Sequence, residues 1–362
     1  MAKKRVSLRN LAPNMVVAND VYTMHDQLII PQHTVLSEEI IERLTAYSIP
    51  YVIIDDTEVP ASQVISSLGE STLSERIQES VEFKEFQNVY KKQAASFKKM
   101  LDGAVFSGST LDTQELLDTS MTLLSKSRNS LHIFDMLHNM HETDDITYAH
   151  SINVSLLCVI IGQWVGFPKK DLDVLCVGGL LHDVGKLLIP DSIMYKEGKL
   201  TSNEFEIIKT HTLRGYDLLT SKNLDERIAK IALMHHERFD GSGYPQGLKV
   251  NDIEDFAKIV SIADVYDAMT ATRCYRDALC PFEAIRIFED EGLQKYDPKF
   301  IMTFLENVVS SYINNKVILS NGMTGDIVFI NKMFLSKPII KLDDGTFIDL
   351  SKERSLDILA IL

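Results

Sequence analysis

One run of residues, His182-Asp183-Val184-Gly185-Lys186-Leu187-Leu188-Ile189-Pro190-Asp191, sets the architecture of this chain. It joins an imidazole to a carboxylate and places a lysine one helical turn later, before a proline. The pair His182-Asp183 alone says little, because His25-Asp26 repeats it near the N-terminus with no other ligand nearby. Its meaning depends on the residues around it.

Further imidazoles and carboxylates accompany this run, and both groups suit a divalent metal. A single histidine such as His150 or His211 is most often an ordinary core or surface residue. Seven potential ligands within one segment are hard to explain in that way, so we interpret them together as a metal centre. The candidate ligands are His150, His182, Asp183, His211, His235, His236 and Asp264.

The spacing within the run indicates two ions rather than one. Adjacent helical residues point about 100 degrees apart, so His182 and Asp183 serve neighbouring ions. Asp183 has two oxygens and is the natural bridge. Two adjacent divalent ions lower the pKa of a shared water and stabilise the attacking and leaving oxygens of a phosphate displacement. We therefore predict Asp183 and Lys186 as catalytic residues, and Lys186, Arg273 and Arg276 as cations that hold phosphate.

Composition limits the class of protein. With 362 residues, 45% of them hydrophobic, the chain is long enough for two or three globular domains. A formal net charge of -14 and a pI near 5.2 argue against a partner of duplex nucleic acid or of an anionic membrane. We find no signal peptide, and no window approaches the roughly 18 apolar residues of a membrane span. The cysteines, Cys158, Cys176, Cys274 and Cys280, lack C-x-x-C spacing. Free thiols in a reducing, cytoplasmic setting are therefore expected.

The N-terminal part of the chain predicts two regions. Residues 1–56 alternate short apolar runs with turn signals, which favours a small α+β module. Residues 57–142 predict a linker followed by a helical connector, which either supports a homodimer or is a solvated connection. The expected elements are strands at 28–31 and 51–55, a short helix at 37–44, a linker at 57–72, and helices at 73–101 and 112–140.

The remainder of the chain predicts a helical region at 143–312 and a β-rich tail at 313–362. The helical region should be a bundle of at least six helices, and its starts carry capping signals. We expect N-caps at Thr143-Asp144-Asp145, a helix from Asp171 through Lys186, a capping box at Thr201–Glu204 opening the helix that carries His211, helices at 224–237 and 253–271, and Pro281 and Pro298 in first turns. We expect Asn321-Gly322, Pro338 and Asp344-Gly345 to divide the strands of the tail.

The motifs together resemble the HD-GYP family of the HD phosphohydrolase superfamily. The resemblance covers about residues 143 to 310. It implies a mainly α fold, in which an HD-type helical bundle core is joined to the small α+β module, the helical connector and the small β-rich tail. The motifs that carry it are His182–Asp191, His211, His235-His236-Glu237 through Gly243-Tyr244-Pro245, and Ala263-Asp264-Val265-Tyr266-Asp267-Ala268-Met269 with Arg273-Cys274-Tyr275-Arg276.

The same resemblance implies an activity and a set of site residues. The activity is that of a cyclic di-GMP phosphodiesterase that opens the cyclic dinucleotide to linear pGpG and, in some members, continues to GMP. The seven candidate ligands fall on metal-ligand positions, and Lys186, Arg273 and Arg276 fall on phosphate-contact positions. Tyr244 contacts substrate, shapes the mouth of the cleft, or belongs to a docking surface for a signalling protein.

One position departs from the family pattern. Members with three metals carry a glutamate four residues before the first histidine, and this chain has Ile146 there. We therefore expect two divalent ions, iron or manganese, with zinc, nickel and magnesium as alternatives. Whether pGpG is cleaved further stays open.

Our prediction is a metal-dependent enzyme that hydrolyses cyclic di-GMP in bacterial second-messenger signalling. Two alternatives remain: a phosphohydrolase of another cyclic dinucleotide or of a nucleotide alarmone, and a catalytically silent cyclic di-GMP receptor or interaction protein. No motif reads the base, so the first alternative stays open. The second would lose ligands, whereas this chain keeps all seven.

Overall fold

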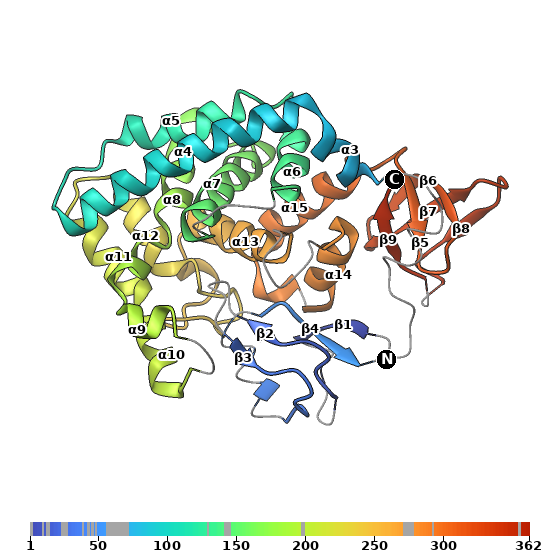
Figure 1. Ribbon diagram of the computed structural model, residues 1–362, viewed down its shortest axis with the longest axis horizontal. Helices are drawn as coiled ribbons and strands as arrows, with labels where there is room; N and C mark the ends of the chain where they lie inside the picture. The colour runs from blue at the N-terminus through green and yellow to red at the C-terminus, as the bar shows by residue number, and fades with distance from the viewer. Residues whose placement is uncertain are drawn as a thin grey trace.

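The computed structural model describes residues 3–8, 11, 15–22, 28–37, 40–41, 44, 47, 49–55, 72–128, 130–140, 146–196, 200–270, 279–291, 293–353 and 356–362. It confirms the mainly α class (Figure 1). A helical bundle fills the centre, a small N-terminal module with short strands lies beneath it, and a C-terminal sheet lies at one end.

The central helix of the bundle is α7 (Ile146–Val165), which packs against α8 (Lys169–Leu181), α13 (Asp255–Thr270) and α15 (Pro298–Ser310). Every side chain from 148 to 161 is buried. By length and composition Thr147–Val165 qualifies as a membrane span, so our expectation that no window comes near one is wrong. The helix is apolar all round because protein surrounds it: 83% of that window is buried.

The helical connector covers one side of the bundle (Figure 1). The two predicted helices are present, and each is divided in two. Ser80 ends the first helix and caps the second, and α4 then packs against α5 and α7. The four helices are α3 (Leu73–Glu79), α4 (Val81–Phe106), α5 (Thr113–Leu124) and α6 (Ser130–His138). The predicted linker at 57–72 lies, apart from Thr72, outside the described residues.

The remaining elements of the bundle are shorter. The capping box at Thr201 and Glu204 is present, and Pro281 and Pro298 do begin helices. The predicted caps at 143–145 lie outside the described residues. The elements are η2 (Val184–Leu188), α9 (Asp191–Met194), α10 (Ser202–Lys209), α11 (His211–Thr220), α12 (Glu226–Met234), η3 (Val250–Asp252), α14 (Pro281–Glu291) and η4 (Leu293–Lys295).

Two predicted helices are wrong in their extent. The helix expected to reach Lys186 starts at Lys169 and ends at Leu181, and the chain continues as the 3-10 turn η2. The reason is a close approach of two backbones: a Cβ at Gly185 would lie 1.9 Å from the carbonyl oxygen of His211. The helix expected to carry His211 ends at Lys209, and His211 instead begins α11.

Short antiparallel pairs form the N-terminal module, and five antiparallel strands form the C-terminal sheet in the order β8-β7-β6-β5-β9. The strands are β1 (Lys3–Ser7), β2 (Val21–Tyr22), β3 (Leu28–Ile30), β4 (Tyr51–Asp55), β5 (Lys316–Leu319), β6 (Thr324–Asn331), β7 (Phe334–Leu342), β8 (Phe347–Asp349) and β9 (Ile358–Ile361). The helix predicted at 37–44 is helical at 40, 41 and 44, and its other positions except 37 lie outside the described residues. Pro338 does not divide strands as expected. It lies within β7, next to a register shift where the ladder is already irregular.

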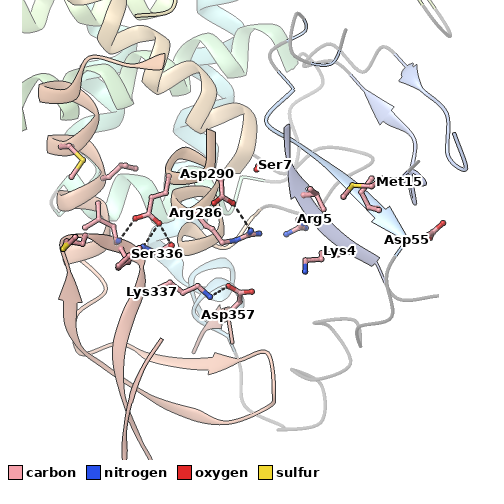
Figure 2. A pocket seen from close by; sticks show the side chains of 18 of the residues that line it. Lys4, Arg5, Ser7, Met15, Asp55, Arg286, Asp290, Ser336, Lys337 and Asp357 are labelled. Carbon is pink, nitrogen blue, oxygen red and sulfur yellow. Dashed lines mark hydrogen bonds and ion pairs between the residues drawn. The ribbon is translucent and has the colours of Figure 1, made fainter. Parts of the chain in front are cut away.

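A cavity of about 1470 Å³ lies where the module, the bundle and the sheet meet. Figure 2 shows Lys4 and Arg5 of β1 on one side and the ion pair of Lys337 with Asp357 on the other. Arg5 crosses to the bundle, where its guanidinium lies 2.6 Å from the Glu283 carboxylate on α14. The residues that line this cavity include none of the predicted site residues.

Candidate metal centre

All seven candidate ligands lie together inside the bundle, and each is at most 6% exposed. Five separate parts of the chain supply them. They are His150 in α7, His182 and Asp183 at the end of α8, His211 at the start of α11, His235 and His236 at the end of α12, and Asp264 in α13. The ends of α8 and α12 and the start of α11 converge because η2 and α11 touch along the backbones of Gly185 and Gly215.

The ligand atoms form two groups, within each of which they lie no more than 4.8 Å apart. The groups are His150, His182 and Asp264, and Asp183, His211, His235 and His236.

Asp183 faces both groups, one oxygen toward each. Its Oδ2 lies 3.3 Å from His182 Nε2 and 3.8 Å from His150 Nε2. Its Oδ1 lies 3.4 Å from His211 Nε2 and 3.5 Å from His235 Nε2. A carboxylate with this placement is able to bind one cation on each side.

The atoms that face the centre have no hydrogen-bond partner within the described part of the chain outside the group of ligands itself, where His150 Nε2 lies 3.1 Å from Asp264 Oδ1. They are His150 Nε2, His182 Nε2, Asp183 Oδ1, His236 Nδ1 and Asp264 Oδ1. Each buried polar atom left unpaired costs about 1–3 kcal/mol. A cluster of such atoms therefore indicates that something else satisfies them.

The ring nitrogens that point away from the centre indicate the chemical nature of the missing partner. The Nδ1 atoms of His182, His211 and His235 donate to backbone carbonyls at 2.7, 2.8 and 3.0 Å. Each ring therefore presents a lone pair at Nε2, and the Nε2 atoms of His211 and His235 face each other at 3.4 Å. Two lone pairs that face each other repel unless a cation lies between them. The residues present fit divalent metal ions.

Burial keeps most of these imidazoles in the form that binds metal. It lowers the pKa of His211 to about 3, and it lowers the pKa of His235 and of His236 as well. For Asp183 burial acts to raise the pKa, but Lys186 and His182 hold it well below the usual range. These rings are neutral and this carboxyl is charged near pH 7, as metal ligation requires.

His150 differs from the other histidines. Burial acts to lower its pKa, but hydrogen bonds and charge from Asp264 and Asp267 outweigh burial and raise the pKa to about 9. The Asp264 and Asp267 carboxylates lie 3.1 Å from His150 Nε2 and 2.7 Å from its Nδ1. Without a cation, His150 carries an extra proton at pH 7.

Of the four predicted substrate contacts, the structure describes Lys186 and Tyr244. The Lys186 ammonium is buried and hydrogen-bonds to Asp183 Oδ2. The Tyr244 ring stacks on the His236 ring, with centroids 4.6 Å apart and an interplanar angle of 26°. Arg273 and Arg276 lie outside the described residues, as does Cys274, and they stay predictions.

Sequence reasoning missed several supporting residues. Asp267 holds His150 Nδ1, and Glu237 holds the loop after α12 by accepting the backbone N–H of Gln246 at 2.7 Å and of Leu248 at 2.9 Å. Asp267 follows Asp264 by three helical positions and therefore shares its face of α13. That spacing was a usable signal. Glu237 belongs to the motif His235-His236-Glu237, but no role was predicted for its side chain from the sequence.

Comparisons with known proteins cover the segment that holds these residues. The HD domain family model matches residues 117–300, a span that contains all seven candidate ligands. A cyclic di-GMP phosphodiesterase of Pseudomonas aeruginosa is 31% identical over 239 residues, which are 65% of this chain and 57% of that protein. A cyclic di-GMP phosphodiesterase of Thermotoga maritima is 38% identical over 177 residues, 48% of each chain. The 3'3'-cGAMP-specific phosphodiesterase 2 of Vibrio cholerae is 37% identical over 180 residues, 48% of this chain and 34% of that protein. The chain thus spans between about a third and somewhat more than half of the length of these curated relatives.

Proposed function

We propose, because this chain belongs to the HD domain family, that it is a metal-dependent phosphodiesterase that hydrolyses cyclic di-GMP to linear pGpG in bacterial second-messenger signalling. The observation that carries the proposal is the buried pair of ligand groups joined by Asp183. Relatives named as cyclic di-GMP phosphodiesterases support the choice of substrate.

We assign the metal ligands by group. His150, His182 and Asp264 would hold one divalent ion, His211, His235 and His236 a second, and Asp183 would bind both. Iron or manganese is proposed, with zinc, nickel and magnesium as alternatives. When bound, such a pair supplies Lewis acidity and makes water nucleophilic at neutral pH.

The protein's own groups then bind and orient the substrate. The Lys186 ammonium, held beside Asp183, is placed to neutralise a phosphoryl oxygen, and Arg273 and Arg276 are proposed to hold the phosphates. The Tyr244 ring, stacked on His236, is proposed to contact the substrate beside the metal centre. Hydrolysis adds one water across a phosphodiester bond, and the ring opens to one phosphomonoester and one hydroxyl.

A second candidate is hydrolysis of another cyclic dinucleotide. The relatives include proteins named as specific for 3'3'-cGAMP at 37% identity. Such an enzyme would share the metal centre and differ in its contacts to the bases.

The setting of the protein and its partners are also proposed. We place it in the cytoplasm, because the cysteines described are free thiols. We propose the Gly243-Tyr244-Pro245 loop as a docking surface for a signalling protein, and the connector helices as a contact between two copies of the chain.

The test is hydrolysis of cyclic di-GMP by protein purified without oxygen and loaded with manganese or ferrous iron. We expect pGpG to accumulate. Asp183→Ala should lower the rate of hydrolysis about 1000-fold or more, as for other groups essential to a catalytic unit. Asp217→Ala is the matched control, because it removes an exposed carboxylate from α11. Onward conversion to GMP would contradict the two-metal argument from Ile146. Faster turnover of 3'3'-cGAMP would favour the second candidate, and turnover of neither substrate would leave a receptor.

A further inference from the structure

A buried chain of hydrogen bonds leads from helix α4 to the metal centre. The Tyr90 hydroxyl on α4 lies 2.6 Å from Asn153 Oδ1 and 2.8 Å from the carbonyl oxygen of Ala149, both on α7. Asn153 Nδ2 donates to Asp267 Oδ1 at 2.8 Å, and Asp267 Oδ2 lies 2.7 Å from His150 Nδ1. The four linked side chains are each at most 6% exposed. A helix outside the centre is thus connected to one of its imidazoles.

The donors and acceptors permit one arrangement of protons along this series of hydrogen bonds. The Asp267 carboxylate only accepts, so Asn153 turns its amide nitrogen toward Asp267 and its oxygen toward Tyr90. Burial, together with the charge of Asp267, raises the pKa of Tyr90, so its hydroxyl keeps the proton that it donates. At the other end His150 donates from Nδ1, and its Nε2 faces the centre. The chain therefore fixes both the tilt and the tautomer of the His150 ring.

Helix α4 also contacts the bundle at neighbouring points. The Tyr148 hydroxyl on α7 donates to Asp102 on α4 at 2.7 Å, and the Phe97 ring of α4 meets the Tyr148 ring edge-on. Helix α4 further packs against η2, the element that carries Lys186. The two helices are thus held together by more than one bond, and among the described residues the bond from Tyr90 is the one that continues to a candidate ligand.

We infer that Tyr90 is a positioning residue that couples the placement of helix α4 to the metal centre through Asn153 and Asp267. A shift of α4 by about 1 Å stretches the hydrogen bond from Tyr90 beyond about 3.5 Å and releases Asn153. Helix α4 follows the N-terminal module in the chain, so this is a route by which a signal received there would change how firmly the metal is held. The inference rests on the proposed function only in taking His150 as a metal ligand.

The test measures metal affinity directly. Tyr90→Phe removes the hydroxyl and keeps the ring in the core. We expect the affinity for Mn²⁺, measured at pH 9 without oxygen by competition with a coloured chelator, to fall about 3- to 10-fold, and about 10- to 100-fold for Asp267→Asn. The double variant should bind Mn²⁺ as Asp267→Asn does, because the series of hydrogen bonds is already interrupted at Asp267. The visible absorption of bound Co²⁺ should change in both single variants, because the His150 ring tilts.

Tyr148→Phe is the matched control. It removes another buried hydroxyl between the same two helices, and it should leave the Mn²⁺ affinity and the Co²⁺ spectrum unchanged. Asn153→Ala interrupts the series of hydrogen bonds one step nearer the metal. It should reproduce the loss of Mn²⁺ affinity even if Tyr90→Phe folds poorly. The inference is overturned if Tyr90→Phe binds Mn²⁺ as the unaltered protein does, if the double variant shows additive losses, or if Tyr148→Phe weakens binding equally.

These measurements separate the inference from the proposed function. They use a metal ion and no cyclic dinucleotide, so the coupling stands or falls whatever the substrate proves to be. Turnover of cyclic di-GMP at saturating metal tests the proposed function alone.

Discussion

Metal binding to this centre should tighten as the pH rises from 7 to 9. In the metal-free protein burial acts to lower the pKa of His150, but Asp264 and Asp267 raise it to about 9. A metal ion requires the unprotonated Nε2, so it must displace this proton. The pKa of His211 is about 3, because burial lowers it, and this ring does not compete in the same range.

The size of the effect follows from the two-unit gap between pH 7 and that pKa. At pH 7 His150 is therefore mostly protonated, which costs metal binding about 3 kcal/mol at roughly 1.4 kcal/mol per unit. The affinity should therefore rise about tenfold per pH unit and level off near pH 9. The stability of the metal-free protein should move in the opposite direction. A folded-state pKa above the unfolded value of about 6.5 contributes stability that is complete below pH 6.5 and is lost as the pH rises through 9.

The assay is calorimetric titration with Mn²⁺ at pH 7, 8 and 9, in pairs of buffers that differ in ionisation enthalpy. We expect about one proton released per chain at pH 7 and 8 and about half a proton at pH 9, because His150 belongs to one of the two ligand groups. Thermal unfolding of the metal-free protein is measured over the same pH range. A loss of stability as the pH rises, in the absence of metal, would identify His150 and not a metal-bound water as the source of the proton. In Asp267→Asn one of the two carboxylates that raise the pKa is neutral, so the rise in affinity should move to lower pH. An affinity that stays constant from pH 7 to 9 with no proton release would refute the reasoning.

Two further predictions concern the turn after α8. Gly185→Ala places a Cβ 1.9 Å from a backbone oxygen of α11 and should lower the free energy of unfolding by more than about 3 kcal/mol in urea, whereas Gly215→Ala, whose nearest neighbour would be 3.3 Å away, should change it by less than about 1 kcal/mol. Equal effects would contradict the close approach of the two backbones. Lys186→Met removes the buried ammonium beside the bridging aspartate and should lower kcat about 100-fold while metal analysis still finds two ions per chain. Loss of metal in that variant would instead give the lysine a structural role.

Much of the helical region was predictable, because its residues satisfy local rules. The capping box of Thr201 with Glu204 and the prolines at positions 281 and 298 fix helix starts through backbone chemistry that a sequence displays. The candidate ligands were identifiable for a different reason: seven histidines and aspartates in one segment are hard to explain as ordinary core or surface residues.

The features that were missed depend on contacts between distant parts of the chain. The turn at Gly185 forms because another backbone passes close by, and no local propensity encodes that neighbour. Pro338 is tolerated inside β7 because the pairing with β6 is irregular there. The link from Tyr90 to His150 joins residues far apart in the sequence, so no spacing rule predicts it.

The two apolar cores do not follow the division of the chain into helices and strands. Side chains of the C-terminal sheet, such as Leu319 and Ile340, share one continuous core with Phe304 and the other bundle helices, and the Glu289 carboxylate on α14 accepts the backbone N–H of Leu335 in β7. The N-terminal module has a core of its own, although Tyr51 of β4 belongs to the larger core. Changes inside the module's core should therefore disturb the bundle less than changes inside the sheet. Removing the sheet, in contrast, would open the core of the helices to water.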